Sequence, residues 1–362
     1  MPPKVLLLTA AYGEGHNAAA RGLQMGLREA GTEAEIFDLF ALTGGVQFER
    51  SRRAYLGIIN HAPRLWAAVY WLIHRVPLVS MSLPLLGKLQ RALADLIEAE
   101  EPTAIISVYP VYGYLIAKLF PGARPFSFHT VVTDSITINS VWHRCPSDSF
   151  IVPNEDSAAV MRDAGVPAAK IHILGFPVPP IFAHDRPARA SLAQPHVLYM
   201  INAGQAQAPK IVRRLLKVPG IQLSVTIGRE ERLRRPLEKI ASDLGKKLTV
   251  LGWTPNMPEL LMTHHLLIGK AGGATVQETI AAGTPMLLTK IVPGQEEGNA
   301  QLLLQNECGA LCTTPDALAK AVTRAFANDA ALWRRWVQNI SRLSKPDAAS
   351  DIAQFVLHFA HA

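Results

Sequence analysis

The feature that most restricts the fold is a pattern of strand, small-residue loop and helix that occurs twice. Residues Lys4–Ala10 form a short apolar run that leads through glycines into a helical pattern over Asn17–Ala30. Residues His196–Ile201 form a second such run, followed by a small-residue loop and a helical pattern over Pro209–Leu216. Apolar strands that alternate with helices are typical of parallel sheets covered on both faces. The pattern therefore predicts two doubly wound α/β domains.

Further apolar runs support the same organisation. They are Ala104–Val108, Ser127–Val132, Phe150–Val152, Leu223–Ile227, Leu266–Ile268 and Pro285–Leu288, and helical patterns separate most of them. The length of 362 residues suits two domains. A proline-rich stretch between Pro177 and Pro195 suits an extended connection between them. We therefore expect an N-terminal domain over residues 1–180 and a C-terminal domain over residues 190–345.

The charge of the chain points to an anionic partner, because the formal net charge is +7 and the sequence pI is about 9.4. From Arg50 to Ala94 there is no acidic residue, while basic and aromatic side chains are interleaved with many Leu, Ile and Val. This composition is typical of an amphipathic segment at a membrane interface. The predicted membrane contacts are Arg52, Arg53, Arg64, Trp66, Tyr70, Trp71 and Arg75. The alternative is a helical insertion with a solvated basic rim. Nucleic acid fits less well, since the basic residues lie within an apolar run.

Other features exclude several classes of protein. The three cysteines, Cys145, Cys308 and Cys312, have neither a paired framework nor the spacing of a zinc site, so we expect no metal ion. No stretch reaches the roughly 18 unbroken apolar residues of a membrane-spanning helix. The opening residues lack the pattern of a signal peptide. We therefore expect a protein that is soluble or lies on one face of a membrane.

The first glycine loop reads Gly13-Glu14-Gly15-His16-Asn17-Ala18. With Asp38 at a suitable distance it matches the fingerprint of a dinucleotide-binding fold, so an NAD-dependent enzyme is one reading. His16 is the residue of this loop that the dinucleotide fingerprint does not explain. The positive end of a helix dipole disfavours an imidazolium there, and a neutral imidazole suits a general base. The alternative is a histidine that only caps the helix.

The second glycine loop, Lys270-Ala271-Gly272-Gly273-Ala274-Thr275, lies between the predicted strand Leu266–Ile268 and a helical pattern over Val276–Ala282. Small residues at a helix N-terminus favour the binding of an anion such as a diphosphate. Glu278, one turn into the helix, is placed to accept hydrogen bonds from ribose hydroxyls. The next loop, Val292–Asn299, is rich in hydrogen-bonding groups suited to a sugar. The alternative is that these glycines serve only tight packing.

A third motif is Val131-Val132-Thr133-Asp134, an apolar strand that ends in an acid, with Trp142 and His143 shortly after it. A carboxylate at a strand end can orient a hydroxyl group or pair with His16. The alternative is an aspartate that caps a turn.

Together these residues resemble the diacylglycerol glycosyltransferases of the GT-B fold, the group that contains monogalactosyldiacylglycerol synthase and the processive diacylglycerol glucosyltransferases. The resemblance runs through the GEGH turn, FHTVVTDSITINSVWH, TIGREERLRRPLE, LIGKAGGATVQETIAAGTPMLL and PGQEEGNA. The glycine loop with Glu278 and the PGQE loop are its most specific parts. The lipid II-forming N-acetylglucosaminyltransferase is a more distant relative.

The resemblance implies two Rossmann-like domains that face a cleft, and a final helix at residues 346–362 that packs back on the N-terminal domain. It implies an inverting transfer of a hexose from a UDP-sugar to a lipid hydroxyl, without metal ion or cofactor, at an anionic membrane surface on the cytoplasmic face. His16 and Asp134 would be catalytic, with Gly15, Asn17 and His143 around the acceptor. The donor would be bound by Arg229, Gly272, Gly273, Thr275, Glu278, Gln295, Glu296 and Asn299.

One loop departs from the family. Residues Asn202–Pro209 are poorer in glycine than in the relatives, which would weaken the approach of the backbone to a phosphate. Other activities remain possible on the sequence alone: a UDP-sugar 2-epimerase, an NAD-dependent dehydrogenase, or a non-catalytic protein that binds lipid or nucleotide. The sequence does not determine which sugar is used.

Overall fold

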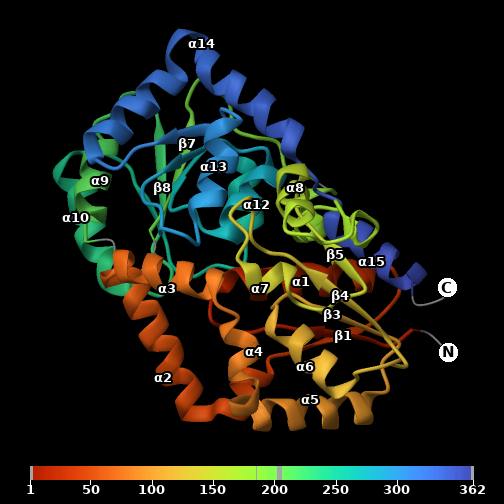
Figure 1. Ribbon diagram of the computed structural model, residues 1–362. Helices are drawn as coiled ribbons and strands as arrows, with labels where there is room; N and C mark the ends of the chain where they lie inside the picture. The colour runs from red at the N-terminus through yellow and green to blue at the C-terminus, as the bar shows by residue number, and fades with distance from the viewer. Residues whose placement is uncertain (1–2, 185, 202–205, 360–362) are drawn as a thin grey trace. The chain divides into compact units, whose positions relative to one another are not determined.

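The computed structural model describes residues 3–184, 186–201 and 206–359. The chain divides into two compact units, which can be followed by colour in Figure 1. The N-terminal unit comprises Met1–Pro180, Val292–Asn299 and Lys345–Ala362, and the C-terminal unit comprises Ile181–Ile291 and Ala300–Ser344. Both units are therefore discontinuous in sequence.

The N-terminal unit is built on six parallel strands in the order β2-β1-β3-β4-β5-β6. The strands are β1 (Val5–Leu8), β2 (Ala34–Phe37), β3 (Ala104–Ser107), β4 (Ser127–Val131), β5 (Ser149–Ile151) and β6 (Ile171–His172). All residues of β1 and β3 are buried, because helices cover both faces of the sheet, and this explains their unbroken apolar runs. The four strands predicted in this part of the chain are confirmed, whereas the edge strands β2 and β6 were not predicted.

The helices of this unit begin with α1 (Glu14–Glu29), which follows the first glycine turn. The others are α2 (Leu39–His61), α3 (Pro63–Arg75), α4 (Leu78–Ser82), α5 (Gly87–Glu100), α6 (Val111–Leu119), α7 (Ser140–His143), α8 (Glu155–Asp163) and α15 (Ala348–Phe359). Three short 3₁₀ segments, Leu83–Leu86, Ala168–Lys170 and Pro180–Phe182, complete the turns in this stretch. Helix α2 contains a break at Gly45, where φ is 47°, a conformation that glycine tolerates better than other residues.

Helix α15, from the last part of the chain, packs on α1. A Cβ atom added at Gly26 of α1 would lie 2.5 Å from the Ala349 carbonyl oxygen, so only glycine allows this approach. Ser350 Oγ donates a hydrogen bond to Glu29 Oε2 at 3.1 Å. Phe359 also meets the buried ring of His129 in β4 edge-on, with the ring centroids 5.0 Å apart.

The C-terminal unit has its own sheet of six parallel strands in the order β12-β11-β10-β7-β8-β9. The strands are β7 (His196–Met200), β8 (Gln222–Thr226), β9 (Thr249–Leu251), β10 (Leu266–Gly269), β11 (Met286–Leu288) and β12 (Gly309–Leu311). The helices are α9 (Ala208–Leu215), α10 (Arg234–Asp243), α11 (Met257–Thr263), α12 (Gly273–Ala282), α13 (Glu297–Gln305) and α14 (Pro315–Leu343), with a 3₁₀ turn at Glu231–Leu233. The four strands predicted here are confirmed, and so is the prediction of two doubly wound parallel sheets.

The C-terminal end of α12 is held by Arg189, from the segment that enters this unit. The guanidinium group donates hydrogen bonds to the carbonyl oxygens of Ala282 at 2.9 Å and Gly283 at 2.7 Å, and to Thr284 Oγ1 at 2.7 Å. Its Nε donates to the Met262 carbonyl oxygen at 3.1 Å. A cation at this end of a helix also interacts favourably with the helix dipole. Arg189 therefore fixes the helix whose other end begins at the second glycine loop.

Candidate active site

His16 lies in the first turn of α1, directly after the glycine turn. Its Nδ1 forms a hydrogen bond with Thr133 Oγ1 over 3.1 Å, and the ring of Tyr109 meets it edge-on with the centroids 5.2 Å apart. Burial lowers the pKa of His16 to about 4, and a hydrogen bond to the backbone of Val108 acts in the opposite direction. The imidazole is therefore uncharged at neutral pH and can accept a proton.

Asp134 follows β4, as the sequence predicted, but its contact is with Trp142. Its Oδ2 accepts a hydrogen bond from Trp142 Nε1 at 2.8 Å, and the ring of Trp142 lies 6.1 Å from that of His16. Burial raises the pKa of Asp134 to about 6, and the bond from Trp142 opposes this rise. The residue that hydrogen-bonds His16 Nδ1 is Thr133, for which no role was predicted.

The other residues predicted around the acceptor are divided between two places. Gly15 and Asn17 lie in the first turn of α1, where Thr9 Oγ1 donates a hydrogen bond to Asn17 Oδ1 at 3.0 Å. His143, in α7, packs instead against His74 of α3, with the ring centroids 6.3 Å apart. Burial lowers the pKa of His143.

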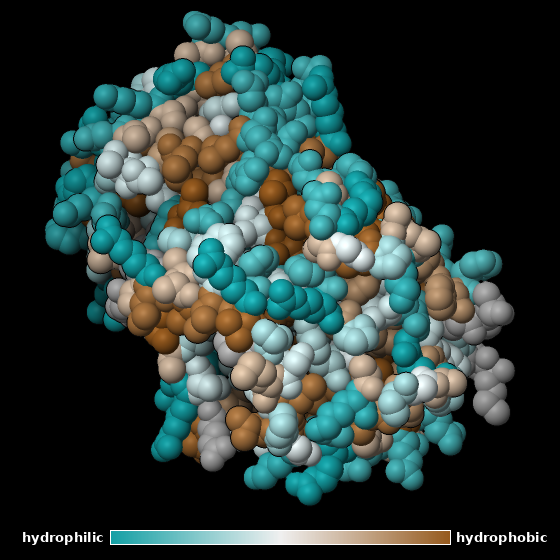
Figure 2. Space-filling view, in the orientation of Figure 1, coloured by the Kyte–Doolittle hydropathy of each residue, from teal (hydrophilic) through white to brown (hydrophobic). Residues whose placement is uncertain are grey.

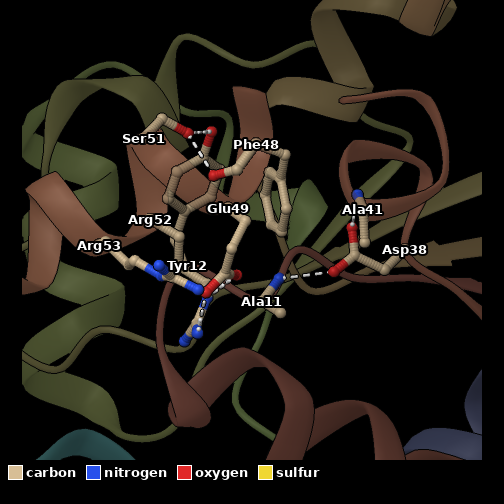
Figure 3. A network of polar contacts seen from close by, with 9 residues as sticks. All are labelled: Ala11, Tyr12, Asp38, Ala41, Phe48, Glu49, Ser51, Arg52 and Arg53. Atoms are coloured by element: carbon tan, nitrogen blue, oxygen red, sulfur yellow. Dashed lines mark hydrogen bonds and ion pairs between the residues drawn. The ribbon is translucent and has the colours of Figure 1, made fainter. Parts of the chain in front are cut away.

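The dinucleotide fingerprint has a structural explanation. Asp38 Oδ2 accepts a hydrogen bond from the backbone N–H of Ala11 at 2.8 Å, and Oδ1 accepts one from the N–H of Ala41 at 2.9 Å, as Figure 3 shows. Its carboxylate thus caps α2 and holds the loop after β1. This capping role explains why an aspartate occupies position 38 without requiring that it bind a ribose.

The basic aromatic segment Arg50–Arg91 forms α2 to α4 and the start of α5. Arg52 Nε and Arg53 Nε lie 2.9 Å from the carboxylate oxygens of Glu49, so one acid, just outside the segment, serves both guanidinium groups (Figure 3). Two of the predicted membrane contacts are therefore ion-paired within the helix. The exposed Arg64 and Arg75 of α3 extend the basic character of the segment.

The aromatic residues of this segment differ in exposure. Trp71 is 45% exposed, whereas Tyr70 is only 6% exposed, and its hydroxyl donates a hydrogen bond to the Thr137 carbonyl oxygen at 3.1 Å. Trp66 meets the Tyr55 ring edge-on, with the centroids 5.0 Å apart. Tyr70 is thus a core residue and not the surface contact that composition predicted. The reason is that consecutive residues of a helix point in directions about 100° apart, so Tyr70 can be buried while its neighbour Trp71 is exposed.

The second glycine loop leads from β10 into α12, as predicted, although the helix begins at Gly273 and not at Val276. A Cβ atom added at Gly272 would meet nothing closer than 3.7 Å, so its backbone is open to approach. The N–H of Ala271 donates a hydrogen bond to the Lys290 carbonyl oxygen at 3.2 Å, which joins this loop to the one after β11. The first N–H groups of α12 have no acceptor within the helix, so they can bind an anion.

The remaining donor-site residues of this unit lie near the carboxyl ends of the strands of the same sheet. Thr275 and Glu278 are half-buried in the first two turns of α12. Arg229 is exposed in the loop after β8. Because the strands are parallel, this loop and the loop after β10 both leave the sheet at the carboxyl ends of the strands. Of the loop Asn202–Pro209, residues 202–205 lie outside the described residues, so its effect on a phosphate stays a prediction.

The loop Val292–Asn299 packs within the N-terminal unit. A Cβ atom added at Gly298 would lie 1.8 Å from the Ser135 carbonyl oxygen. The buried Glu296 accepts a hydrogen bond at Oε2 from the N–H of Val292 at 3.0 Å, so part of its carboxylate braces the loop. Gln295 is half-buried and Asn299 is buried. This placement was not predicted, since the loop follows a strand of the other unit.

Residues 3–184, 186–201 and 206–359 contain neither a metal-binding cluster nor a single helix that could span a membrane. No group of three or more His, Cys, Asp or Glu side chains is arranged to hold a metal ion. No single helix of this part is long and apolar enough to cross a membrane, although the bent pair Arg64–Arg75 and Val79–Glu100 meets the test on length and composition alone.

Solved structures show the fold class. The chain is similar to Os79 from O. sativa, solved with U2F and trichothecene, at 13% identity and a TM-score of 0.66, with 99% of each chain covered. It is also similar to the UDP-GlcNAc 2-epimerase from Neisseria meningitidis bound to UDP-GlcNAc, at 12% identity and a TM-score of 0.61, with 98% and 100% covered. The fold is thus GT-B, and it does not by itself separate transferases from epimerases.

Proteins similar in sequence distinguish between a transferase and an epimerase. Residues 16–178 match the monogalactosyldiacylglycerol (MGDG) synthase family, and residues 203–352 match the glycosyltransferase family 28 C-terminal domain. The chain is 27% identical over 370 residues to a processive diacylglycerol beta-glucosyltransferase of Bacillus mycoides, with 99% of this chain and 95% of the relative covered. It is 27% identical over 380 residues to a probable chloroplastic monogalactosyldiacylglycerol synthase of Glycine max, with 97% and 70% covered.

The protein is therefore a glycosyltransferase. More closely, its N-terminal part matches the MGDG synthase family and its C-terminal part matches the family 28 C-terminal domain, and the chain is similar over nearly its whole length to diacylglycerol glycosyltransferases. This finding excludes the NAD-dependent dehydrogenase as a reading of the first glycine loop.

Proposed function

We propose that the enzyme transfers a hexose from a UDP-sugar to the hydroxyl group of a diacylglycerol-type lipid, with inversion at the anomeric carbon. The names of the relatives support a diacylglycerol acceptor and a glucosyl or galactosyl product. The observation that carries the proposal is the uncharged His16 at the first glycine turn, hydrogen-bonded to Thr133. A neutral imidazole there is what activation of an acceptor hydroxyl requires.

In the proposed reaction, the acceptor oxygen forms a bond to the anomeric carbon while the bond from that carbon to the β-phosphate oxygen breaks. His16 takes the proton of the acceptor hydroxyl, and UDP leaves with the electron pair. The pKa of about 4 belongs to the free protein. The negative charge of a bound diphosphate would favour the imidazolium and so make His16 a stronger base in the complex.

The C-terminal unit would hold the donor. The N-terminus of α12, with Gly272, Gly273 and Thr275, would bind the diphosphate through backbone N–H groups. Glu278 would accept hydrogen bonds from the ribose, and Arg229 would stabilise the charge that develops on the leaving UDP. These groups can perform that stabilisation without a metal ion.

A membrane surface would present the acceptor. Large apolar side chains are exposed along α3 and the turns after it, with Leu72 52% exposed, Met81 65% and Leu85 86%. Figure 2 shows an apolar surface over α3. Together with Arg64 and Arg75, this surface suits the interfacial region of an anionic membrane. We propose attachment from the cytoplasmic side, where anionic lipids are enriched.

The test is transfer of labelled sugar from UDP-galactose, UDP-glucose and UDP-N-acetylglucosamine to diacylglycerol in vesicles with and without phosphatidylglycerol. We expect a glycolipid with one preferred donor, and faster transfer with the anionic vesicles. No glycolipid from any donor, together with no binding of UDP, would contradict the proposal. Conversion of UDP-N-acetylglucosamine to its 2-epimer in the absence of vesicles would favour the epimerase reading instead.

A further inference from the structure

A tyrosine of the basic aromatic segment contacts the loop Val292–Asn299, which the resemblance predicts to bind the donor sugar. Tyr55 of α2 donates a hydrogen bond from its hydroxyl to Gln295 Oε1 at 3.1 Å. The two residues are 240 positions apart in the chain. Both belong to the N-terminal unit, so this contact lies within one compact body.

The loop has little freedom to move away from this contact. The ring of Tyr70 lies beneath Gly294, where a Cβ atom would come within 2.7 Å of Tyr70 Cδ1. The φ of Gly294 is 79°, which only glycine adopts readily. On the other side, Gly298 lies against the backbone of Ser135. The backbone on both sides of Gln295 is thus held, and the orientation of its side chain depends on Tyr55.

The direction of the hydrogen bond has a chemical consequence. Burial raises the pKa of Tyr55 to about 12, and the bond to Gln295 acts in the opposite direction, so the hydroxyl keeps its proton and donates. A glutamine amide has one acceptor end and one donor end. Because the acceptor end faces Tyr55, the amino group is the end that can turn to a ligand. Gln295 is therefore set to donate hydrogen bonds to sugar oxygens.

We propose that Tyr55 is a positioning residue that sets the orientation of the Gln295 amide and so helps determine which hexose the enzyme accepts. This inference rests on the proposed use of a UDP-sugar donor. The ring of Tyr55 is itself fixed edge-on between Trp66 at 5.0 Å and Tyr12 at 5.9 Å, measured between ring centroids. The hydroxyl can consequently be removed without loss of the packing around the ring.

The experiment is a double-mutant cycle with Tyr55→Phe, Gln295→Ala and the double variant. For each, KM and kcat are measured with UDP-glucose and UDP-galactose on the same vesicles. We expect Tyr55→Phe to raise the KM for the preferred donor and to lower the ratio of kcat/KM between the two donors, each by about 3- to 10-fold, as for one lost hydrogen bond. In the Gln295→Ala background the same change should have less than about a 2-fold effect, because the residues act as a pair.

Two further variants separate positioning from general damage. Tyr114→Phe removes another largely buried tyrosine hydroxyl, which donates to the Val141 carbonyl oxygen at 3.1 Å, and it should leave the donor ratio unchanged. Gln295→Glu keeps an acceptor for Tyr55 but has no amino group, so it should lower the donor ratio even with Tyr55 intact.

The outcomes are distinct. If Tyr55→Phe behaves like Tyr114→Phe, or if its effect multiplies with that of Gln295→Ala, Tyr55 does not act through Gln295 and the inference is wrong while the proposed function stands. If the wild-type enzyme neither binds nor uses any UDP-sugar, the proposed function fails and the inference falls with it.

Discussion

His16 lies in the first turn of a helix and is kept uncharged chiefly by burial, and the positive end of the helix dipole acts in the same direction. Thr133 and Tyr109, in the loops that follow strands β4 and β3, contact its ring. A side chain fixed in this way loses little freedom when substrate binds, and such preorganisation favours catalysis.

The first prediction at this scale concerns His16→Ala. If His16 is the base, turnover should fall by roughly 10²–10⁴-fold, while binding of UDP changes little. Turnover is measured by glycolipid formation, and UDP binding by calorimetry. The exposed His358 in α15 offers a matched control, and His358→Ala should retain full turnover. Turnover of His16→Ala within a few-fold of the wild type would remove His16 from this role.

The sequence identified His16 and Asp134 because each stands out in a local motif. It did not identify Thr133 or Tyr55, because their partners lie 117 and 240 residues away. Neither residue type is unusual at its position. Their roles depend on which segments the fold brings together, and local patterns do not contain that information.

Among the elements, central strands were easier to predict than edge strands. The central strands are buried on both faces and form continuous apolar runs, whereas β2 contains Glu35 and β6 has two residues. Helix α12 was predicted to begin at Val276, but it begins at Gly273. Propensity scales place glycine outside helices, yet at the first position of a helix it leaves room for an anion.

The prediction at this scale concerns the arginine that holds the end of α12. Arg189→Met removes hydrogen bonds to four acceptors and the cation at the helix C-terminus. We expect the free energy of unfolding of the C-terminal unit to fall by about 3 kcal/mol. Arg189→Lys keeps the charge but loses the several N–H donors of the guanidinium group. Its free energy of unfolding should lie between those of Arg189→Met and the wild type.

Urea denaturation measures these changes. The exposed Arg213 of α9 gives the control, because Arg213→Met should change stability by less than about 0.5 kcal/mol. Equal stability of the Arg189 and Arg213 variants would show that the hydrogen bonds at the end of α12 add nothing to the fold.

For the molecule as a whole, the sequence predicted two parallel-sheet units. It did not predict that residues 292–299 leave the second unit and pack in the first. That return is specified by close backbone contacts such as Gly298 against Ser135. A glycine in a polar loop has many possible explanations in sequence, and only the fold selects among them.

The stability of the whole molecule should depend on pH. Burial lowers the pKa of His16, His129 and His265 to about 4. Below the usual histidine pKa the unfolded chain therefore binds protons that the folded chain does not, and stability falls as the pH drops from about 6.5 towards 4. Asp134 acts in the opposite sense below pH 6, since its raised pKa lets the folded state bind a proton first.

Burial also lowers the pKa of His74, His143, His172 and His264, and these residues add to the fall in stability. Each histidine contributes at most one proton, or about 1.4 kcal/mol per pH unit. Urea midpoints at pH 7, 6 and 5 measure the slope. His129→Gln should reduce the slope of stability against pH by the contribution of one proton. His129 is buried and hydrogen-bonded to Ser127 and Ser149. A flat or rising stability from pH 7 to pH 5 would contradict the prediction.

The packing of α15 against α1 has a consequence for how the enzyme is made. A ribosome releases residues 345–359 only after the whole C-terminal unit has been synthesised, and domains generally fold as the chain emerges. Helix α1, which bears His16, therefore lacks its contacts with α15 until α15 has been synthesised. A chain that ends before α15 would leave Gly26 and Glu29 of α1 without these contacts, so translation itself would delay the complete packing of the N-terminal unit until α15 has been made.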